Sequence, residues 1–272
     1  MRRTFSRLQI VGSLFLLIGI SCVTFIPHTP VYKNLVYSLW EEGYKDTAYH
    51  LNRADGKLAL QAGYYYYGAG AYDVDKAAWS FQIALRYDPK VLWGHYQLAR
   101  IYFVQGKFTK ALQEINAELA ANPANLRALY VRGLVYISLD NLPAAEEDFR
   151  NFVAWAPAEW GGYNDLAFVL AKEGKYTESE MVIMQSMQKV PNASDVAWLW
   201  NSLGLAQLNQ QKYTDAQVSF AKALALAEHM TTQEWVRAYS GNDPALAADA
   251  ILHFKSSIQD NLLKAGAGYI RE

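Results

Sequence analysis

Apolar positions along most of this chain recur every three or four residues, a period that predicts helices with one buried face. The stretch KYTDAQVSFAKAL, residues 212–224, shows the pattern clearly. Its side chains Ala216, Phe220, Ala223 and Leu224 stand at i, i+4, i+7 and i+8, on one side of a helix. We therefore expect an all-α protein.

The same arrangement occurs five times along the chain. Each copy opens with a small residue and places a large apolar one four positions later: Ala77 and Phe81, Ala111 and Ile115, Ala145 and Phe149, Ser179 and Ile183, Ala216 and Phe220. The first four copies end at prolines spaced 34 residues apart: Pro89, Pro123, Pro157 and Pro191. The last copy departs from this period, because its opening residue, Ala216, follows Ser179 by 37 positions. A fixed internal period of this length is typical of stacked repeats.

Each copy has a second helical face about a dozen residues upstream. In four copies that face carries a small residue, which would let two helices cross closely: Ala99, Gly133, Ala167 and Gly204. Gly106, Gly174 and the Asp140–Asn141 pair fall between the two faces and are predicted turn residues. One helical hairpin cannot bury its own apolar face, so neighbouring hairpins are expected to stack into a rod.

These features resemble the tetratricopeptide repeat family. The copy most similar to the family pattern combines Trp200, Leu203 and Gly204 with Ala216, Phe220 and Ala223. The resemblance implies a right-handed superhelical solenoid of about five helical hairpins over residues 58–228. In the first hairpin Tyr65 stands where the family has glycine or alanine, which leaves its register open.

Segments on both sides of the repeats are predicted to cap the stack with helices. Residues 27–57 contain a helical stripe formed by Val31, Leu35, Val36 and Leu39. In residues 229–272, Asp243 and Pro244 have the residue types of a helix start. The stripe that follows predicts a final helix over the open end of the rod: Ala247, Ile251, Phe254, Ile258 and Leu262.

The N-terminal segment has the pattern of a membrane anchor. Residues 1–7 are basic, with arginines at positions 2, 3 and 7, and residues 8–26 contain no charge. A helix of that length is about as long as the hydrocarbon core of a bilayer is thick. We therefore expect one transmembrane helix at 8–26 with its N-terminus in the cytoplasm. The expected localisation is a single pass through the cytoplasmic (inner or plasma) membrane, with the repeat domain outside.

Two alternatives remain for this segment. A cleaved signal peptide usually has a shorter apolar core and small residues at its cleavage site, and no A-x-A pattern follows here. A lipoprotein would be lipidated at Cys22, because Gly19–Cys22 resembles a lipidation box, although Gly19 departs from the branched apolar residue of that motif. Each alternative would also send residues 28–272 out of the cytoplasm.

Composition narrows the possible chemistry. Hydrophobic residues make up 52% of the chain and charged ones 19%, which indicates a folded protein. The net charge of −1, without a basic block, argues against nucleic-acid binding. Cys22 is the sole cysteine of the sequence, so the repeats can hold no internal disulfide and no cysteine-ligated zinc.

Little of the chain outside the repeats is left for catalysis. The histidines, at positions 28, 50, 95, 229 and 253, lack the i, i+4 partner of a helical zinc site. Glu146, Glu147 and Asp148 are adjacent on a helix, so they splay around it and are expected to face solvent. The sequence therefore predicts no enzyme, no catalytic residue, no metal site and no cofactor.

The family geometry implies a concave groove lined by the first helix of each hairpin. The groove residues would be Tyr66, Trp93, Tyr96, Arg100, Phe103, Arg127, Tyr130, Leu134, Asn164, Phe168, Lys172, Trp198, Asn201 and Leu205. Aromatic and arginine side chains are the usual anchors of binding partners. The alternative is that many of these side chains pack between repeats. The clamp with which some relatives hold a C-terminal carboxylate is not carried over, because Ala62, Tyr96 and Tyr130 stand at one of its positions.

The leading hypothesis is a membrane-anchored adaptor or scaffold that holds a protein or peptide partner in this groove, outside the cytoplasm. A second is a lipoprotein that helps to assemble an envelope complex such as a pilus or secretion system. A third, of another class, is a glycan- or small-ligand-binding or catalytic protein that uses the same aromatic groove. The sequence predicts no oligomeric state.

Overall fold

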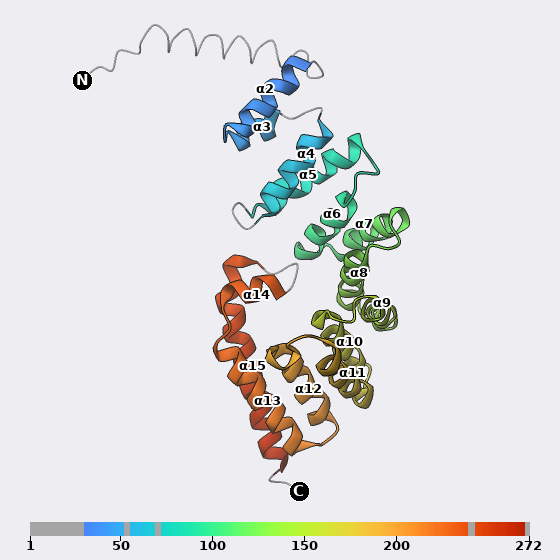
Figure 1. Cartoon of the computed structure of the whole chain (residues 1–272), viewed down its shortest axis with the longest axis vertical. Helices are drawn as coiled ribbons and strands as arrows, with labels where there is room; N and C mark the ends of the chain where they lie inside the picture. Colours follow the sequence, from blue (N-terminus) through green and yellow to red (C-terminus); the bar gives the residue numbers. More distant parts are fainter. Residues whose placement is uncertain (1–29, 52–54, 69–71, 239–242, 270–272) are drawn as a thin grey trace, which may run out of the picture. The chain divides into compact units, whose positions relative to one another are not determined.

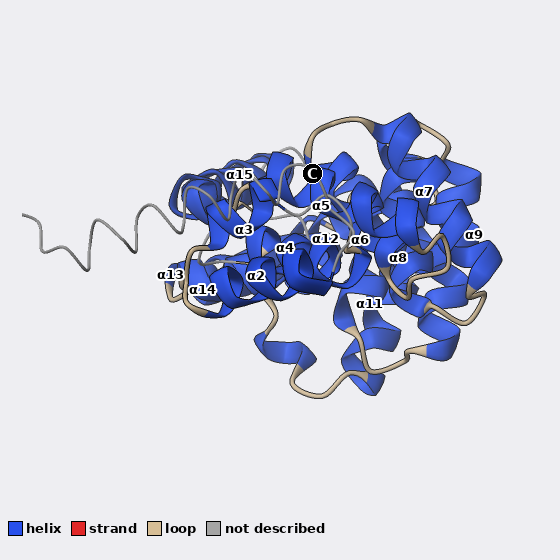
Figure 2. Cartoon of the chain, turned by 90° about the horizontal axis from the view of Figure 1, so that it is seen from above, coloured by secondary structure: helices blue, strands red, loops and turns tan. Residues whose placement is uncertain are grey.

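The described parts of the chain consist of helices and the turns and loops that join them. The computed structural model describes residues 30–51, 55–68, 72–238 and 243–269, and every regular element in these ranges is a helix (Figures 1 and 2). It forms two compact units, Met1–Gly94 and His95–Glu272. The prediction of an all-α solenoid of helical hairpins is confirmed.

The first unit has four described helices. They are α2 (Pro30–Glu41), α3 (Lys45–Leu51), α4 (Gly56–Tyr67) and α5 (Val74–Tyr87). Helix α4 packs along α5, and α2 packs on α3. Val36 is buried in the core of this unit, but Val31, predicted on the same stripe, is 74% exposed. Tyr32 lies in the core instead, with Ala48 and Leu58.

The second unit continues the series from α6, whose first residue, Gly94, ends the first unit. Its elements are α6 (Gly94–Val104), α7 (Phe108–Ala121), α8 (Leu126–Ser138), α9 (Leu142–Trp155), α10 (Trp160–Lys172), α11 (Tyr176–Lys189), η1 (Ala193–Asp195), α12 (Ala197–Asn209), α13 (Tyr213–Glu228), α14 (Thr232–Ala238), η2 (Pro244–Leu246) and α15 (Ala247–Tyr269). Each helix from α7 to α12 packs on the next helix in the chain, for example α8 on α9 and α12 on α13. Figure 1 shows α15 running beside α13.

Close crossing within a hairpin depends on a small residue that faces a large one. In α8, a Cβ added to Gly133 would lie 2.7 Å from Cζ of Phe149 in α9. Gly204 and Phe220 make the same contact in α12 and α13, again at 2.7 Å. Both rings are fully buried. Each ring therefore lies directly on the backbone of its glycine, which leaves no room for a side chain there.

The sizes of the two facing residues change together along the chain. Glycine is paired with phenylalanine in three hairpins, and alanine with isoleucine at the equivalent positions of the other two. The pairs are Gly63 and Phe81, Ala99 and Ile115, Gly133 and Phe149, Ala167 and Ile183, Gly204 and Phe220. An extra methyl group on one helix is thus balanced by a smaller side chain on the other, which keeps the packing dense in every hairpin.

The register of the first hairpin differs from that of the others. Its small residue, Gly63, lies 18 positions before Phe81, whereas the other pairs are 16 positions apart. Helices α4 and α5 are joined by six residues, and the later hairpins by three, so the first hairpin has a longer turn. Tyr65, at the position expected for the small residue, is 44% exposed. The register that the sequence left open is thereby assigned.

The turns within the hairpins lie where the sequence placed them. Gly106, Asp140 and Gly174 have φ angles of +69°, +57° and +77°. Gln211, at the equivalent position of the last hairpin, has a φ of +62°. This left-handed conformation ends a helix and lets the chain reverse, and glycine adopts it without strain. The periodic prolines follow the C-cap residues directly, as Pro123 follows Asn122.

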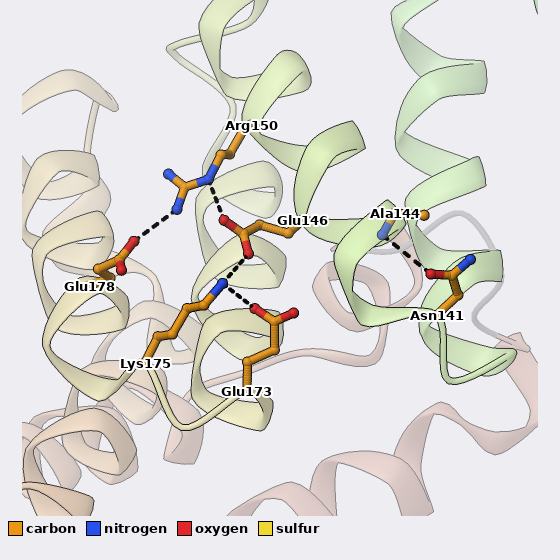
Figure 3. Close-up of polar contacts among 7 residues, drawn as sticks. All are labelled: Asn141, Ala144, Glu146, Arg150, Glu173, Lys175 and Glu178. Carbon is orange, nitrogen blue, oxygen red and sulfur yellow. Dashed lines mark hydrogen bonds and ion pairs between the residues drawn. The ribbon is translucent and has the colours of Figure 1, made fainter.

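An ion-pair network joins the second helices of two neighbouring hairpins, α9 and α11 (Figure 3). The carboxylate of Glu146 accepts hydrogen bonds from Arg150 Nε at 2.6 Å and from Lys175 Nζ at 2.7 Å. Lys175 also lies 2.8 Å from Glu173, and Arg150 Nη2 donates to Glu178 at 2.9 Å. One carboxylate thus holds a cation from α9 and a cation from the turn directly before α11.

The prediction that Glu146, Glu147 and Asp148 all face solvent is wrong for two of them. Asp148 is 2% exposed and accepts hydrogen bonds from Arg132 Nε at 2.8 Å and Nη2 at 2.7 Å. Because Arg132 lies in α8, this bidentate pair ties the two helices of one hairpin together. Glu146 belongs to the network between hairpins, and Glu147 is exposed.

Acid is expected to weaken the contact between α9 and α11. Partial burial raises the pKa of Glu146, but hydrogen bonds from Lys175 and Arg150 outweigh it and lower this pKa to about 2. The carboxylate therefore stabilises the fold above its ordinary pKa of 4.5, and this contribution is lost as the pH falls from 4.5 towards 2. We expect Glu146→Gln to remove about 1 kcal/mol near neutral pH, less than the pKa shift alone suggests because solvent screens the network.

Urea denaturation near pH 7 and near pH 3 would measure this effect. The wild type should lose more stability on acidification than Glu146→Gln, while the exposed Glu147→Gln should behave as the wild type. Equal loss in the wild type and Glu146→Gln would contradict the prediction.

The C-terminal cap follows the predicted stripe. Asp243 accepts a hydrogen bond from the backbone nitrogen of Ala245 at 2.8 Å and so starts the turn before α15. Ile258 of α15 is fully buried against the cluster that contains Phe220 and Ala223 of α13. The last hairpin is therefore covered by a helix that does not belong to the repeat.

The predicted transmembrane helix needs correction. Among the described residues, no helix is both long enough and apolar enough to cross a membrane. The 23-residue α15 is long enough, but it carries Asp249, Lys255 and Asp260, which are costly in a bilayer core. The prediction of a membrane span, and of the single-pass localisation that rests on it, therefore has no support in the described structure. Residues 8–26, where the span was predicted, and Cys22 lie outside the described residues.

Candidate partner-binding site

Two adjoining clefts lie in the second unit, lined largely by the first helices of its hairpins. The first, here called the arginine cleft, has a volume of about 520 Å³. Its charged and aromatic lining comes from α6, α8, α9, α10 with the residue before it, and α14. These residues are Tyr96, Arg100, Arg127, Tyr130, Phe152, Glu159, Trp160 and Arg237. The lining therefore contains three arginines and one acidic residue.

The second cleft, here called the tryptophan cleft, has a volume of about 420 Å³. Its apolar lining is Trp160, Val196, Ala197, Trp198, Leu226 and Met230. Asp195, His229 and Glu234 add polar groups at this cleft. Trp160, Arg237 and Ala238 line both clefts, so the two adjoin.

A stack of aromatic rings supports the tryptophan cleft. The rings of Trp160 and Trp198 are nearly parallel, with centroids 5.1 Å apart, and Phe254 stacks on Trp198 at 5.6 Å. Trp235 of α14 lies 5.7 Å from Trp198 and 5.9 Å from Phe254. Rings from α10, α12, α14 and α15 are thereby held in fixed positions, which makes this wall rigid.

A chain of hydrogen bonds fixes the first helices relative to one another. The Tyr130 hydroxyl donates to Asp165 at 2.5 Å, and Asn164 Nδ2 donates to the other oxygen of Asp165 at 3.2 Å. Ser202 in turn donates to Asn164 Oδ1 at 2.8 Å. These bonds join α8, α10 and α12, so the lining of the clefts is set by neighbouring hairpins together.

The predicted groove residues are dispersed. Those that line the clefts are Tyr96, Arg100, Arg127, Tyr130 and Trp198. Tyr96, one of these cleft residues, is buried, so its side chain also belongs to the core. Asn164, which lines neither cleft, is buried as well. Phe103, Leu134, Asn201 and Leu205 are half-buried outside the clefts.

Two further pairs lie elsewhere. Phe168 and Lys172 are exposed, with the Lys172 ammonium 5.5 Å from the Phe168 ring, but neither lines a cleft. Tyr66 and Trp93 belong to the first unit, where buried Tyr66 donates a hydrogen bond to Asp46 at 2.9 Å. Binding by any of the fourteen predicted residues remains a prediction.

The sequence missed several residues that line the clefts. The 34-residue period that links Trp93 to Arg127 continues to Gly161. Trp160, one position earlier, lines the clefts but was not among the predicted groove residues. Three other lining residues lie outside the first helices of the hairpins: Leu226, Met230 and Arg237. The family geometry predicts groove residues only within those first helices, so it did not include them. Trp160 carried a usable signal, because a large aromatic beside the periodic position can take the same role.

The described residues hold no group of three or more His, Cys, Asp and Glu side chains that could bind a metal ion. The clefts can instead bind by stacking on aromatic rings, by hydrogen bonds from guanidinium groups and by burial of apolar side chains. These are means of recognising another polypeptide.

Comparison with known proteins places these repeats in a family. The family model described as tetratricopeptide repeat matches residues 60–125 and 96–159. No curated protein matches the chain. Among solved structures the chain is similar to MamA, with 18% identity, a TM-score of 0.56, and coverage of 64% of this chain and 92% of MamA.

Two other solved structures extend the likeness. YrrB, titled a TPR protein with an unusual peptide-binding site, shares 16% identity at a TM-score of 0.54, covering 71% of this chain and 93% of YrrB. A tetratricopeptide repeat protein from Parabacteroides merdae shares 17% identity at a TM-score of 0.51, covering 90% of this chain and 88% of that protein. At these identities the likeness concerns the fold. The repeats, the family match and the shared fold agree, and residues 60–159 consist of tetratricopeptide repeats.

Proposed function

We infer that this protein is a non-catalytic scaffold that binds a segment of a protein partner in the arginine and tryptophan clefts. The observation that carries this proposal is the pair of adjoining clefts, which share Trp160 and Arg237 and are lined by aromatic, apolar and guanidinium side chains. Tryptophan, tyrosine and arginine are the residue types that contribute most to binding energy at protein interfaces.

The rigidity of the walls supports the same function. Stacked rings and hydrogen bonds between hairpins hold the lining in place before a partner arrives, so little conformational entropy is lost on binding. YrrB, which shares the fold, is described as having a peptide-binding site, and this adds support for a peptide ligand.

Site-specific photocrosslinking would test the proposal. A photoreactive residue is placed at Glu159 or at Glu234, which are exposed and line the arginine and tryptophan clefts respectively. Glu147, exposed in α9 and outside both clefts, is the matched control. We expect a discrete crosslinked protein at the two cleft positions and none at Glu147 in the cells that express this chain. The same crosslink at all three positions, or at the control alone, would contradict the proposal.

A further inference from the structure

The arginine cleft concentrates positive charge in a chain whose charges are otherwise balanced. The sequence has 25 lysines and arginines against 26 acidic residues. Around this cleft, however, Arg100, Arg127 and Arg237 stand with Glu159 as the single acidic residue of the lining. Like charges gathered at one cleft repel one another, and an anionic group placed there would relieve that repulsion.

The three arginines come from elements far apart in the sequence, so their meeting is a property of the fold. Arg100 lies in α6, Arg127 in α8 and Arg237 in α14. Arg100 is oriented by a hydrogen bond from Nη1 to Gln97 at 2.8 Å, and its guanidinium lies 5.6 Å from the centre of the Tyr96 ring. Arg127 and Arg237 are exposed and can turn towards a ligand.

The neighbouring tryptophan cleft is more apolar, although Asp195 and Glu234 also line it. Beside the stacked Trp160 and Trp198, its wall includes Val196, Leu226 and Met230. An apolar side chain buried there would leave water, which favours binding. Because Trp160 and Arg237 belong to both clefts, one short segment can reach both of them.

We propose that the partner segment is acidic, with one or two carboxylates held by Arg100, Arg127 and Arg237 and a bulky apolar side chain a few residues away held in the tryptophan cleft. This inference rests on the proposed function and adds the chemistry of the ligand. Carboxylates suit the site because a guanidinium binds them with two parallel hydrogen bonds. The clamp differs from the lysine and asparagine clamp of some family members in its residues, and one of its arginines comes from outside the repeats.

Panning a random peptide library on the full chain would test the inference. The wild type is compared with Arg127→Gln/Arg237→Gln, in which both changed residues are exposed and folding should be preserved. The matched control is Lys189→Gln/Lys222→Gln, which removes two exposed cations from α11 and α13, outside the clefts. We expect peptides that combine Asp or Glu with Trp, Phe or Leu. They should bind the arginine variant about tenfold more weakly and the control as they bind the wild type.

Salt provides a second measurement on the same peptides. Raising sodium chloride from about 0.05 to about 0.5 M should weaken their binding to the wild type more than to the arginine variant, because ions screen exposed charges. Selection of peptides without acidic residues, or acidic peptides that bind both proteins equally, would overturn the inference and leave the proposed function standing. Selection of no peptide by the wild type would overturn both.

Discussion

Replacing Phe149 by alanine is expected to lower the free energy of unfolding by about 3–5 kcal/mol, the range for a buried phenylalanine. Phe149 is fully buried, and its ring lies on the backbone of Gly133 in the facing helix. The cavity would open between α8 and α9, in the interior of the stack, where neighbouring hairpins limit relaxation. Urea denaturation followed by circular dichroism would measure the loss.

The pairing of residue sizes along the chain makes a sharper test. Gly133→Ala should cost about 1–3 kcal/mol, because the new methyl group would meet the Phe149 ring. Adding Phe149→Ile re-creates the alanine–isoleucine pair of the neighbouring hairpins, Ala99 with Ile115 and Ala167 with Ile183. The double variant should therefore be more stable than Gly133→Ala alone, and the two changes should be strongly non-additive. Additive losses would show that the pairing has no energetic basis.

Replacing Trp160 by alanine is expected to weaken binding of a cleft-selected peptide about 100-fold, the size of effect seen at interface hot spots. Trp160 lines both clefts and stacks on Trp198, so its removal takes away a contact surface shared by the two halves of the site. Fluorescence anisotropy of a labelled peptide from the panning experiment would measure the affinity.

Trp155 supplies the matched control. It lies five positions before Trp160, at the end of α9, and is 77% exposed outside both clefts. Trp155→Ala should leave the affinity unchanged. Equal weakening by the two variants would show that the peptide does not bind in the clefts, and a thermal melt of Trp160→Ala would establish that the variant is folded.

The hairpins could be predicted because their signals are local. A helix shows its buried face through apolar residues three and four positions apart, and the turn residues Gly106 and Gly174 and the prolines punctuate the chain within each period. The alternation of glycine–phenylalanine with alanine–isoleucine was also present in the sequence. Its meaning required the contact between Gly133 and Phe149, because sequence alone does not say which residues of two helices face each other.

The candidate site was harder to predict because it depends on contacts between distant parts of the chain. Tyr96 has the right residue type and helical position for the groove, yet it is almost fully buried. Helix α14 is seven residues long, too short to show a periodic stripe, and nothing in its sequence says that Arg237 lines the same cleft as Arg100 and Arg127. The membrane span, predicted from the absence of charge in residues 8–26, found no support among the described helices.

By itself the sequence determined that the chain contains repeated helical hairpins, where three of them turn and which apolar residues recur on one face of each helix, because these properties follow from the spacing of side chains along a helix. Tertiary structure decided which aromatic side chains line a cleft and which are buried. It also decided that Asp148 holds Arg132 inside a hairpin and that three arginines line one cleft together with Trp160. The physical reason is that burial and charge clustering depend on how helices far apart in the sequence pack together, and no local period encodes that packing.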